Sequence, residues 1–209
     1  MPAASTALRS PHRARVLPRV CQISEYHCGP AVVQMLLAQR GVRANQDRLT
    51  ELAEIQATID VHGARVDQLA RAVERLREDV CLWHKDRASL DDLVAALRRY
   101  HSPVGVEWQG FFEEREEDED FDAGDYGHYS IVTRVDLRRG LVTLRDPYPD
   151  FCHEDRVFKL QWFVKRWWDV NLAPVSSTGI LQPVEDRHLL FVIAGKRATF
   201  PAALGMTRG

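Results

Sequence analysis

CQISEYHCGPAVVQ, residues 21–34, places Gln22 six positions before Cys28, and Gly-Pro and an apolar run follow the cysteine. Proline is favoured in the first turn of a helix, so this pattern predicts a helix over residues 29–41 that ends at Gly41. The body of the helix, AVVQMLLAQ, is almost wholly apolar, which predicts burial on most sides. Cys28 is therefore expected at the N-terminus of a buried helix, where exposed N–H groups and the helix dipole favour a thiolate.

The remaining sequence changes character near residue 100. Before that point, amphipathic patterns predict three more helices, at 45–58, 62–76 and 89–100. After it, the patterns predict short strands and one further helix: strands at 102–108, 128–136, 141–146 and 188–194, and a helix at 162–168. The turn sequence LRRG between the second and third strands indicates a hairpin. Helices followed by an antiparallel sheet are typical of the α+β class.

Composition indicates one globular domain. The chain has 209 residues, 45% of them hydrophobic and 28% charged, which suffices for one sizeable core. The net charge of −2 gives no overall attraction to nucleic acid, and no run reaches the roughly 18 apolar residues of a membrane span. We predict a flexible leader at 1–18, one domain at 19–195 and a C-terminal tail at 196–209.

The four cysteines form no CxxC pair, and no His/Cys cluster has the spacing of a zinc site. No secretory signal precedes them, so we expect reduced thiols, a cytoplasmic location, and neither a metal nor a cofactor. Cys21, Cys81 and Cys152 are predicted to be small buried residues. The alternative for Cys21 is a regulatory disulfide with Cys28, seven positions away.

A cysteine nucleophile needs a base, and His128 is the best placed of the eight histidines. His27 is adjacent to Cys28, but consecutive side chains point apart. His128 opens a predicted strand, and the hairpin returns to deliver Asp146, 18 positions later, near the same end of the sheet. A carboxylate there can accept the second N–H of the imidazole and so hold its orientation.

Gln22 can supply the remaining part of an acyl-transfer site. Negative charge develops on a carbonyl oxygen in the transition state, and hydrogen-bond donors aimed at that oxygen stabilise it. The side-chain amide of Gln22, together with the backbone N–H of Cys28, would form a two-donor oxyanion hole.

Together these residues resemble the bacteriocin-processing, double-glycine-leader class of papain-like cysteine peptidases. The matching elements are Gln22, Cys28-Gly29-Pro30-Ala31, Gly127-His128-Tyr129 and Asp146-Pro147, with Gly41, Gly63, Leu69, Pro103, Phe163 and Trp167 at further positions. The resemblance spans residues 15–170. It implies a papain-like fold in which Cys28 is the nucleophile, His128 the general base and acid, Asp146 the orienting acid and Gln22 the oxyanion donor.

The sequence also departs from that class. Family members are often fused to a membrane transporter and an ATPase, and this sequence contains neither. An acidic segment at 113–125 precedes His128. It is predicted to be a solvated loop, with calcium binding or attraction of basic peptides as alternatives.

We therefore predict a cysteine peptidase that hydrolyses a peptide or isopeptide bond. Its partner would be a peptide or protein substrate, including basic peptides, and not nucleic acid. Two alternatives stay open on the same residues. One is an acyltransferase of transglutaminase type, in which an amine replaces water, and the other is a papain-like binding module without turnover.

Overall fold

The structure, a computed structural model, describes residues 16–77, 79–110, 126–175 and 179–209. Most of the predicted leader and the acidic segment at 113–125 lie outside these residues. The helices are α1 Cys28–Gln39, α2 Gln46–Ala53, α3 Ile59–His62, α4 Val66–Leu76, α5 Leu90–Arg98, α6 Leu160–Arg166 and α7 Phe200–Ala203. The strands are β1 Val80–Lys85, β2 Val104–Gln109, β3 Gly127–Asp136, β4 Leu141–Arg145, β5 Asp155–Lys159, β6 Trp168–Pro174, β7 Leu181–Arg187, β8 Leu190–Gly195 and β9 Thr207–Arg208.

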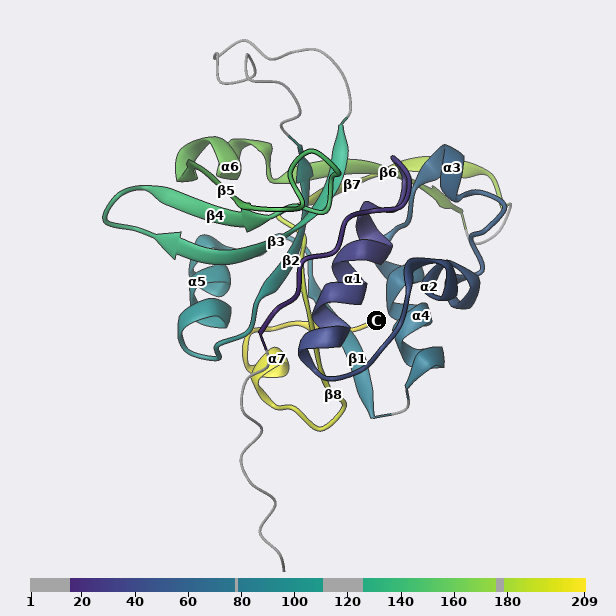
Figure 1. The fold of residues 1–209 in the computed structure, drawn as a ribbon, viewed down its shortest axis with the longest axis horizontal. Helices are drawn as coiled ribbons and strands as arrows, with labels where there is room; N and C mark the ends of the chain where they lie inside the picture. The colour runs from purple at the N-terminus through teal and green to yellow at the C-terminus, as the bar shows by residue number, and fades with distance from the viewer. Residues whose placement is uncertain (1–15, 78, 111–125, 176–178) are drawn as a thin grey trace, which may run out of the picture.

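Within the described residues, one antiparallel sheet of seven strands has the order β5-β4-β3-β2-β8-β1-β9. Helices α1, α2 and α4 lie on one side of it, and α5 and α6 lie on the other (Figure 1). Strands β6 and β7 form a separate antiparallel ribbon. The predicted α+β class is confirmed.

The alternation of side chains along β3 explains why the sheet separates two cores. Successive side chains of a strand point to opposite faces. Tyr129 and Ile131 pack with α1 and α4 in one buried cluster, whereas Val132 packs with Trp108 and the α6 residue Phe163 in the other. Burial on both faces fixes the register of this strand, because a shift by one residue would exchange its two apolar sets.

The hairpin of β3 and β4 follows the predicted turn. Gly140 occupies it with a φ of 64°, a left-handed conformation that glycine adopts without steric cost. The strands pair from Asp136 opposite Leu141 to Ile131 opposite Arg145, with an irregularity between Val132 and Arg134.

Several elements differ from the sequence-based expectation. The second predicted helix ends at Ala53, because Glu54 takes a left-handed conformation with a φ of 62°. Strands β1, β5, β6 and β7 were not predicted. Residues 196–209, expected as a tail, contain α7 and β9, and β9 pairs with β1. Met206 in this segment is 4% exposed.

The prediction of reduced thiols is wrong for two of the four cysteines. Cys21 and Cys152 form a disulfide with Cα atoms 5.2 Å apart, although 131 positions separate them in the sequence. The fold brings the segment before α1 beside the loop after β4, a proximity that cysteine spacing does not encode. Cys28 and Cys81 are free and buried, as expected for Cys81, and the Cys21–Cys28 alternative is excluded. No helix in the described part of the chain has the length and apolarity to span a membrane.

The packing of β2 against β8 yields a stability prediction. A Cβ added at Gly105 would overlap the ring of Phe191, which is fully buried. Gly105→Ala should therefore lower the free energy of unfolding by about 1–3 kcal/mol through overpacking, measured by urea denaturation.

Gly195→Ala at the end of β8 is the matched control. Its added Cβ would meet Asp79 O at an ordinary 3.7 Å, so the free energy of unfolding should change by less than about 0.5 kcal/mol. Equal effects of the two substitutions would contradict this account of the packing.

Candidate active site

Cys28 is the first residue of α1, and its side chain lies at the N-terminus of that helix. The first turn contains no acidic residue, and the preceding His27 makes no side-chain cap. Instead, His27 Nδ1 lies 2.6 Å from Ser24 Oγ. The positive end of the helix dipole is therefore available to a thiolate at Cys28, which is 9% exposed.

The N-terminus of α1 packs against β3, because the Gly29 backbone lies close to the Tyr129 ring. A Cβ added at Gly29 would lie 3.3 Å from Tyr129 Cδ2 and 3.1 Å from Leu69 Cδ1, closer than most side-chain contacts. Glycine thus lets α1 pack directly on the Tyr129 ring. Because Tyr129 follows His128, the same contact brings Cys28 to the start of β3, and a hydrogen bond between Cys28 and His128 contributes to the electrostatics of the imidazole.

His128 and Asp146 meet at the end of the hairpin, as the sequence predicts. His128 Nε2 lies 2.8 Å from Asp146 Oδ1, and the two side chains are 3% and 0% exposed. The bond at Nε2 leaves Nδ1 as the ring nitrogen for the thiol. Asp146 follows β4 directly, so strand pairing fixes its position relative to the imidazole.

Two further donors hold Asp146. Its Oδ1 also accepts from the backbone N–H of Tyr148 at 2.9 Å, and its Oδ2 accepts from Arg156 Nη1 at 2.9 Å. The guanidinium of Arg156 lies over the rings of Phe151 and Phe158, with centroids 3.6 and 4.7 Å away. These cation–π contacts fix the direction of the guanidinium, so both carboxylate oxygens are constrained.

These contacts shift the pKa values of both His128 and Asp146. Burial disfavours the imidazolium, but the charge and hydrogen bond of Asp146, together with Cys28, raise the pKa of His128 to about 10. Burial alone would also raise the pKa of Asp146, yet the charge and hydrogen bond of His128, the Tyr148 N–H and Arg156 hold it below the usual value. The pair is thus an imidazolium and a carboxylate at neutral pH.

Gln22 is buried, at 4% exposed, on the segment that leads into α1. Its backbone N–H donates to Pro147 O at 2.8 Å, which sets it beside the residue that follows Asp146. Its side-chain Nε2 donates to Ser24 O at 2.8 Å. A primary amide carries a second N–H, and this is the group that can act as an oxyanion donor.

A cleft of about 310 Å³ opens beside Cys28. Its lining residues come from the segment before α1, from the end of α3 and from the β6 ribbon; they are Glu25, Tyr26, Cys28, Val61, His62, Gly63, Gly127, Asp169, Val170, Asn171 and Leu172. Four of them are exposed large apolar side chains, namely Tyr26, Val61, Val170 and Leu172. The cleft therefore combines a cysteine thiol with an apolar rim, a composition typical of sites that bind organic ligands.

Asp169 forms part of the cleft wall next to His128. Its carboxylate lies against Gly127, where a Cβ would overlap it. Oδ1 of Asp169 accepts a hydrogen bond from Gln109 Nε2 at 2.9 Å. Burial and the charge of Asp169 raise the pKa of the buried Glu107 carboxyl well above its usual value.

Sequence reasoning did not identify Arg156 or Asp169. Arg156 lies on an edge strand with an ordinary alternating pattern, and Asp169 lies on a strand that was not predicted. Their roles depend on which strands become neighbours, and local patterns do not carry that information.

One group in the described ranges has metal-ligand proximity. The ligand atoms of Cys21, Cys152 and His153 all lie within 4.8 Å of one another. The two sulfurs are joined in the disulfide, so they offer no thiolates to a metal.

The fold is that of papain-like double-glycine peptidase domains, and the predicted resemblance is confirmed at the level of the fold. A similar structure is the peptidase domain of Streptococcus ComA, a bifunctional ABC transporter of a quorum-sensing pathway. It has a TM-score of 0.53 and 18% sequence identity, and the match covers 86% of this chain and 98% of that one.

A second similar structure is a double-glycine motif protease from an AMS/PCAT transporter, solved in complex with a leader peptide. Its TM-score is 0.51 at 12% identity, with 88% of this chain and 96% of that chain covered. No family model matches the sequence, and the comparison with curated proteins finds no match.

The shifted pKa values predict how the pair stabilises the fold. The raised pKa of His128 contributes stability below the unfolded value of about 6.5, and this contribution is lost as the pH rises through about 10. The lowered pKa of Asp146 contributes above about pH 3.9 and is lost as the pH falls. Asp146→Asn should therefore cost most stability between about pH 4 and 6.5.

Urea denaturation of the wild type and of Asp146→Asn across pH 4–10 measures this effect. The difference between their free energies of unfolding should shrink as the pH rises toward 10. A difference that does not change with pH would show that the two groups are not coupled as described.

Proposed function

We propose that this protein is a cysteine peptidase that cleaves a peptide bond through an acyl-enzyme formed on Cys28. The observation that supports this best is the buried hydrogen bond between His128 Nε2 and Asp146 Oδ1, which leaves the other ring nitrogen facing the thiol at the start of α1. Cysteine acyl transfer needs this combination of an activated thiolate, an imidazolium and an acid that orients it.

In the proposed mechanism, the Cys28 thiolate attacks the scissile carbonyl carbon, and His128 is protonated at this stage. The oxygen becomes an oxyanion, which accepts hydrogen bonds from the Cys28 backbone N–H and the Gln22 side-chain amide. His128 then gives its proton to the leaving amine, and the C–N bond breaks to leave a thioester. In the second half-reaction, His128 takes a proton from water, which attacks the thioester and releases the carboxylic acid.

The cleft suggests the kind of substrate. The exposed apolar residues of its rim favour an extended peptide that carries apolar side chains. The carboxylates of Glu25 and Asp169 line the same cleft, so neutral or basic residues should be accepted more readily than acidic ones. The similar protease that was solved with a leader peptide supports a peptide substrate of that kind.

The nucleophile is tested by Cys28→Ala. This variant should show no detectable turnover of a peptide library that the wild type cleaves, while its circular dichroism and unfolding midpoint stay close to those of the wild type. Cys81→Ala, which removes the other free cysteine, is the control and should retain activity. Equal activity in the wild type and Cys28→Ala would exclude the peptidase at this site.

The same assay separates hydrolysis from transfer. A labelled primary amine added as a competing nucleophile would be incorporated into the acyl product by an acyltransferase faster than the product is hydrolysed. Absence of turnover with either acceptor would leave the binding module as the correct alternative.

Gln22→Ala should lower kcat by about 10²–10³-fold with a small change in KM, because the lost donor acts on the oxyanion and not on the ground-state carbonyl. Gln56→Ala, at an exposed glutamine outside the catalytic cleft, is the control and should leave both constants unchanged. An increase in KM at constant kcat would assign Gln22 to substrate binding instead.

A further inference from the structure

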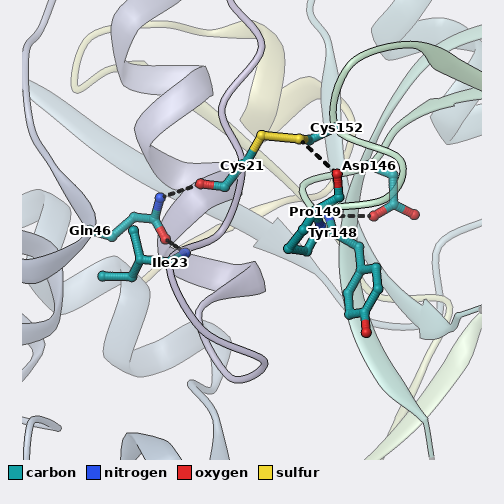
Figure 2. Close-up of a disulfide and its surroundings, with 7 residues drawn as sticks. All are labelled: Cys21, Ile23, Gln46, Asp146, Tyr148, Pro149 and Cys152. Carbon is teal, nitrogen blue, oxygen red and sulfur yellow. Dashed lines mark hydrogen bonds between the residues drawn. A yellow bond between two sulfur atoms is a disulfide. The ribbon is translucent and has the colours of Figure 1, made fainter.

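The Cys21–Cys152 disulfide connects the two chain segments that carry the proposed oxyanion donor and the triad acid. Cys21 directly precedes Gln22, and Cys152 lies in the loop that follows Asp146 (Figure 2). In Figure 2 the sulfur bridge spans from the chain ahead of α1 to the loop after β4. The disulfide therefore joins two segments that are 131 positions apart in the sequence.

On the Cys21 side, the backbone around Gln22 is rigidly held. The side chain of Gln46, 3% exposed, donates from Nε2 to Cys21 O at 2.9 Å and accepts at Oε1 from Ile23 N at 3.0 Å. These two bonds bracket Gln22 and fasten its backbone to α2. A change in the position of Cys21 is thereby a change in the position of Gln22.

On the Cys152 side, the loop donates to one oxygen of Asp146 and supports the Arg156 side chain that donates to the other. Tyr148 N donates to Oδ1, and the ring of Phe151 supports the Arg156 guanidinium that donates to Oδ2. Cys152 is adjacent to Phe151 and is 1% exposed. The disulfide thus ends next to Phe151, whose ring positions the Arg156 guanidinium that donates to Asp146.

Non-covalent contacts also connect the two segments. One backbone hydrogen bond runs from Gln22 N to Pro147 O, and Arg145 donates to Leu17 O. The ion pair of Arg19 with Asp155 is about one-third exposed on each side, and such pairs contribute little. The disulfide therefore adds a covalent restraint between the two segments that carry Gln22 and Asp146.

We propose that the Cys21–Cys152 disulfide is a positioning crosslink for the acyl-transfer site, so that full activity requires this pair oxidised and Cys28 reduced. The inference rests on the proposed function, because it concerns the residues assigned to that reaction. Activity should then pass through a maximum as the redox potential rises. Strong reductants open the crosslink, and strong oxidants convert the Cys28 thiolate to a sulfenic acid or mixed disulfide.

The reductive step balances with a dithiol as the reductant. A reagent thiolate attacks the Cys21 sulfur, which belongs to the partly exposed residue of the pair, and the S–S bond breaks to release the Cys152 thiolate. The second reagent thiol then displaces Cys21 from the mixed disulfide. The products are two reduced cysteines and one oxidised reagent, a transfer of two electrons.

A redox titration of the wild-type protein tests the proposal. Peptidase rates are measured across ratios of reduced to oxidised dithiothreitol, and peptide mass spectrometry reports the state of Cys21 and Cys152 at each ratio. Reduction of the pair should lower kcat by about 10–100-fold, the size expected for misplaced catalytic groups, with KM changed by less than about threefold.

Matched variants complete the design. The double variant Cys21→Ala/Cys152→Ala should have the low kcat without reductant and should not respond to it, whereas Cys81→Ala should respond as the wild type does. Unchanged kcat in the reduced wild type overturns the proposal, as does absence of the disulfide from the purified protein. Loss of the circular dichroism signal together with activity also overturns it, because the crosslink would then maintain the fold and not the site.

A second readout separates this inference from the proposed peptidase activity. The pH profile of Cys28 alkylation by iodoacetamide reports activation of the thiol without any peptide. A profile that shifts to higher pH in the double variant supports the crosslink even if no peptide is cleaved. An unshifted profile together with an unchanged kcat rejects it while leaving the peptidase intact.

Discussion

The buried contact between His128 and Asp146 is the interaction on which the rest of the site depends. An imidazole and a carboxylate that are almost fully buried are costly unless they are paired and hydrogen-bonded. Here the backbone N–H of Tyr148 and the Arg156 guanidinium complete the set of donors around the acid. The pair can therefore remain charged in the interior, as the mechanism proposed for Cys28 requires.

Strand pairing and one glycine determine how Cys28, His128 and Asp146 lie relative to one another. The β3–β4 hairpin sets the distance between histidine and acid, because both residues lie at the same end of paired strands. The absence of a side chain at Gly29 lets α1 approach Tyr129, which brings the helix terminus to the same place. Sheet and helix thus contribute separate parts of one site, and the disulfide adds a covalent restraint between the loops around it.

Much of this arrangement was predictable because it depends on local patterns. The helix at Cys28 follows from a proline before an apolar run, and the pairing of His128 with Asp146 follows from a hairpin whose turn contains Gly140. The long-range features were not predictable. The Cys21–Cys152 bond, the support of Asp146 by Arg156 and the cleft wall at Asp169 all depend on which distant strands and loops become neighbours.

The most direct test of the account is whether the sulfur of Cys28 and the ring of His128 are within reach of one short bridge. A bifunctional alkylating agent such as 1,3-dibromoacetone reacts first with the thiol and then with a nitrogen close to it. We predict a covalent link between the peptides containing Cys28 and His128, which should be absent in His128→Ala. Cys28 alkylated only once, or linked to His27 in its place, would contradict the account.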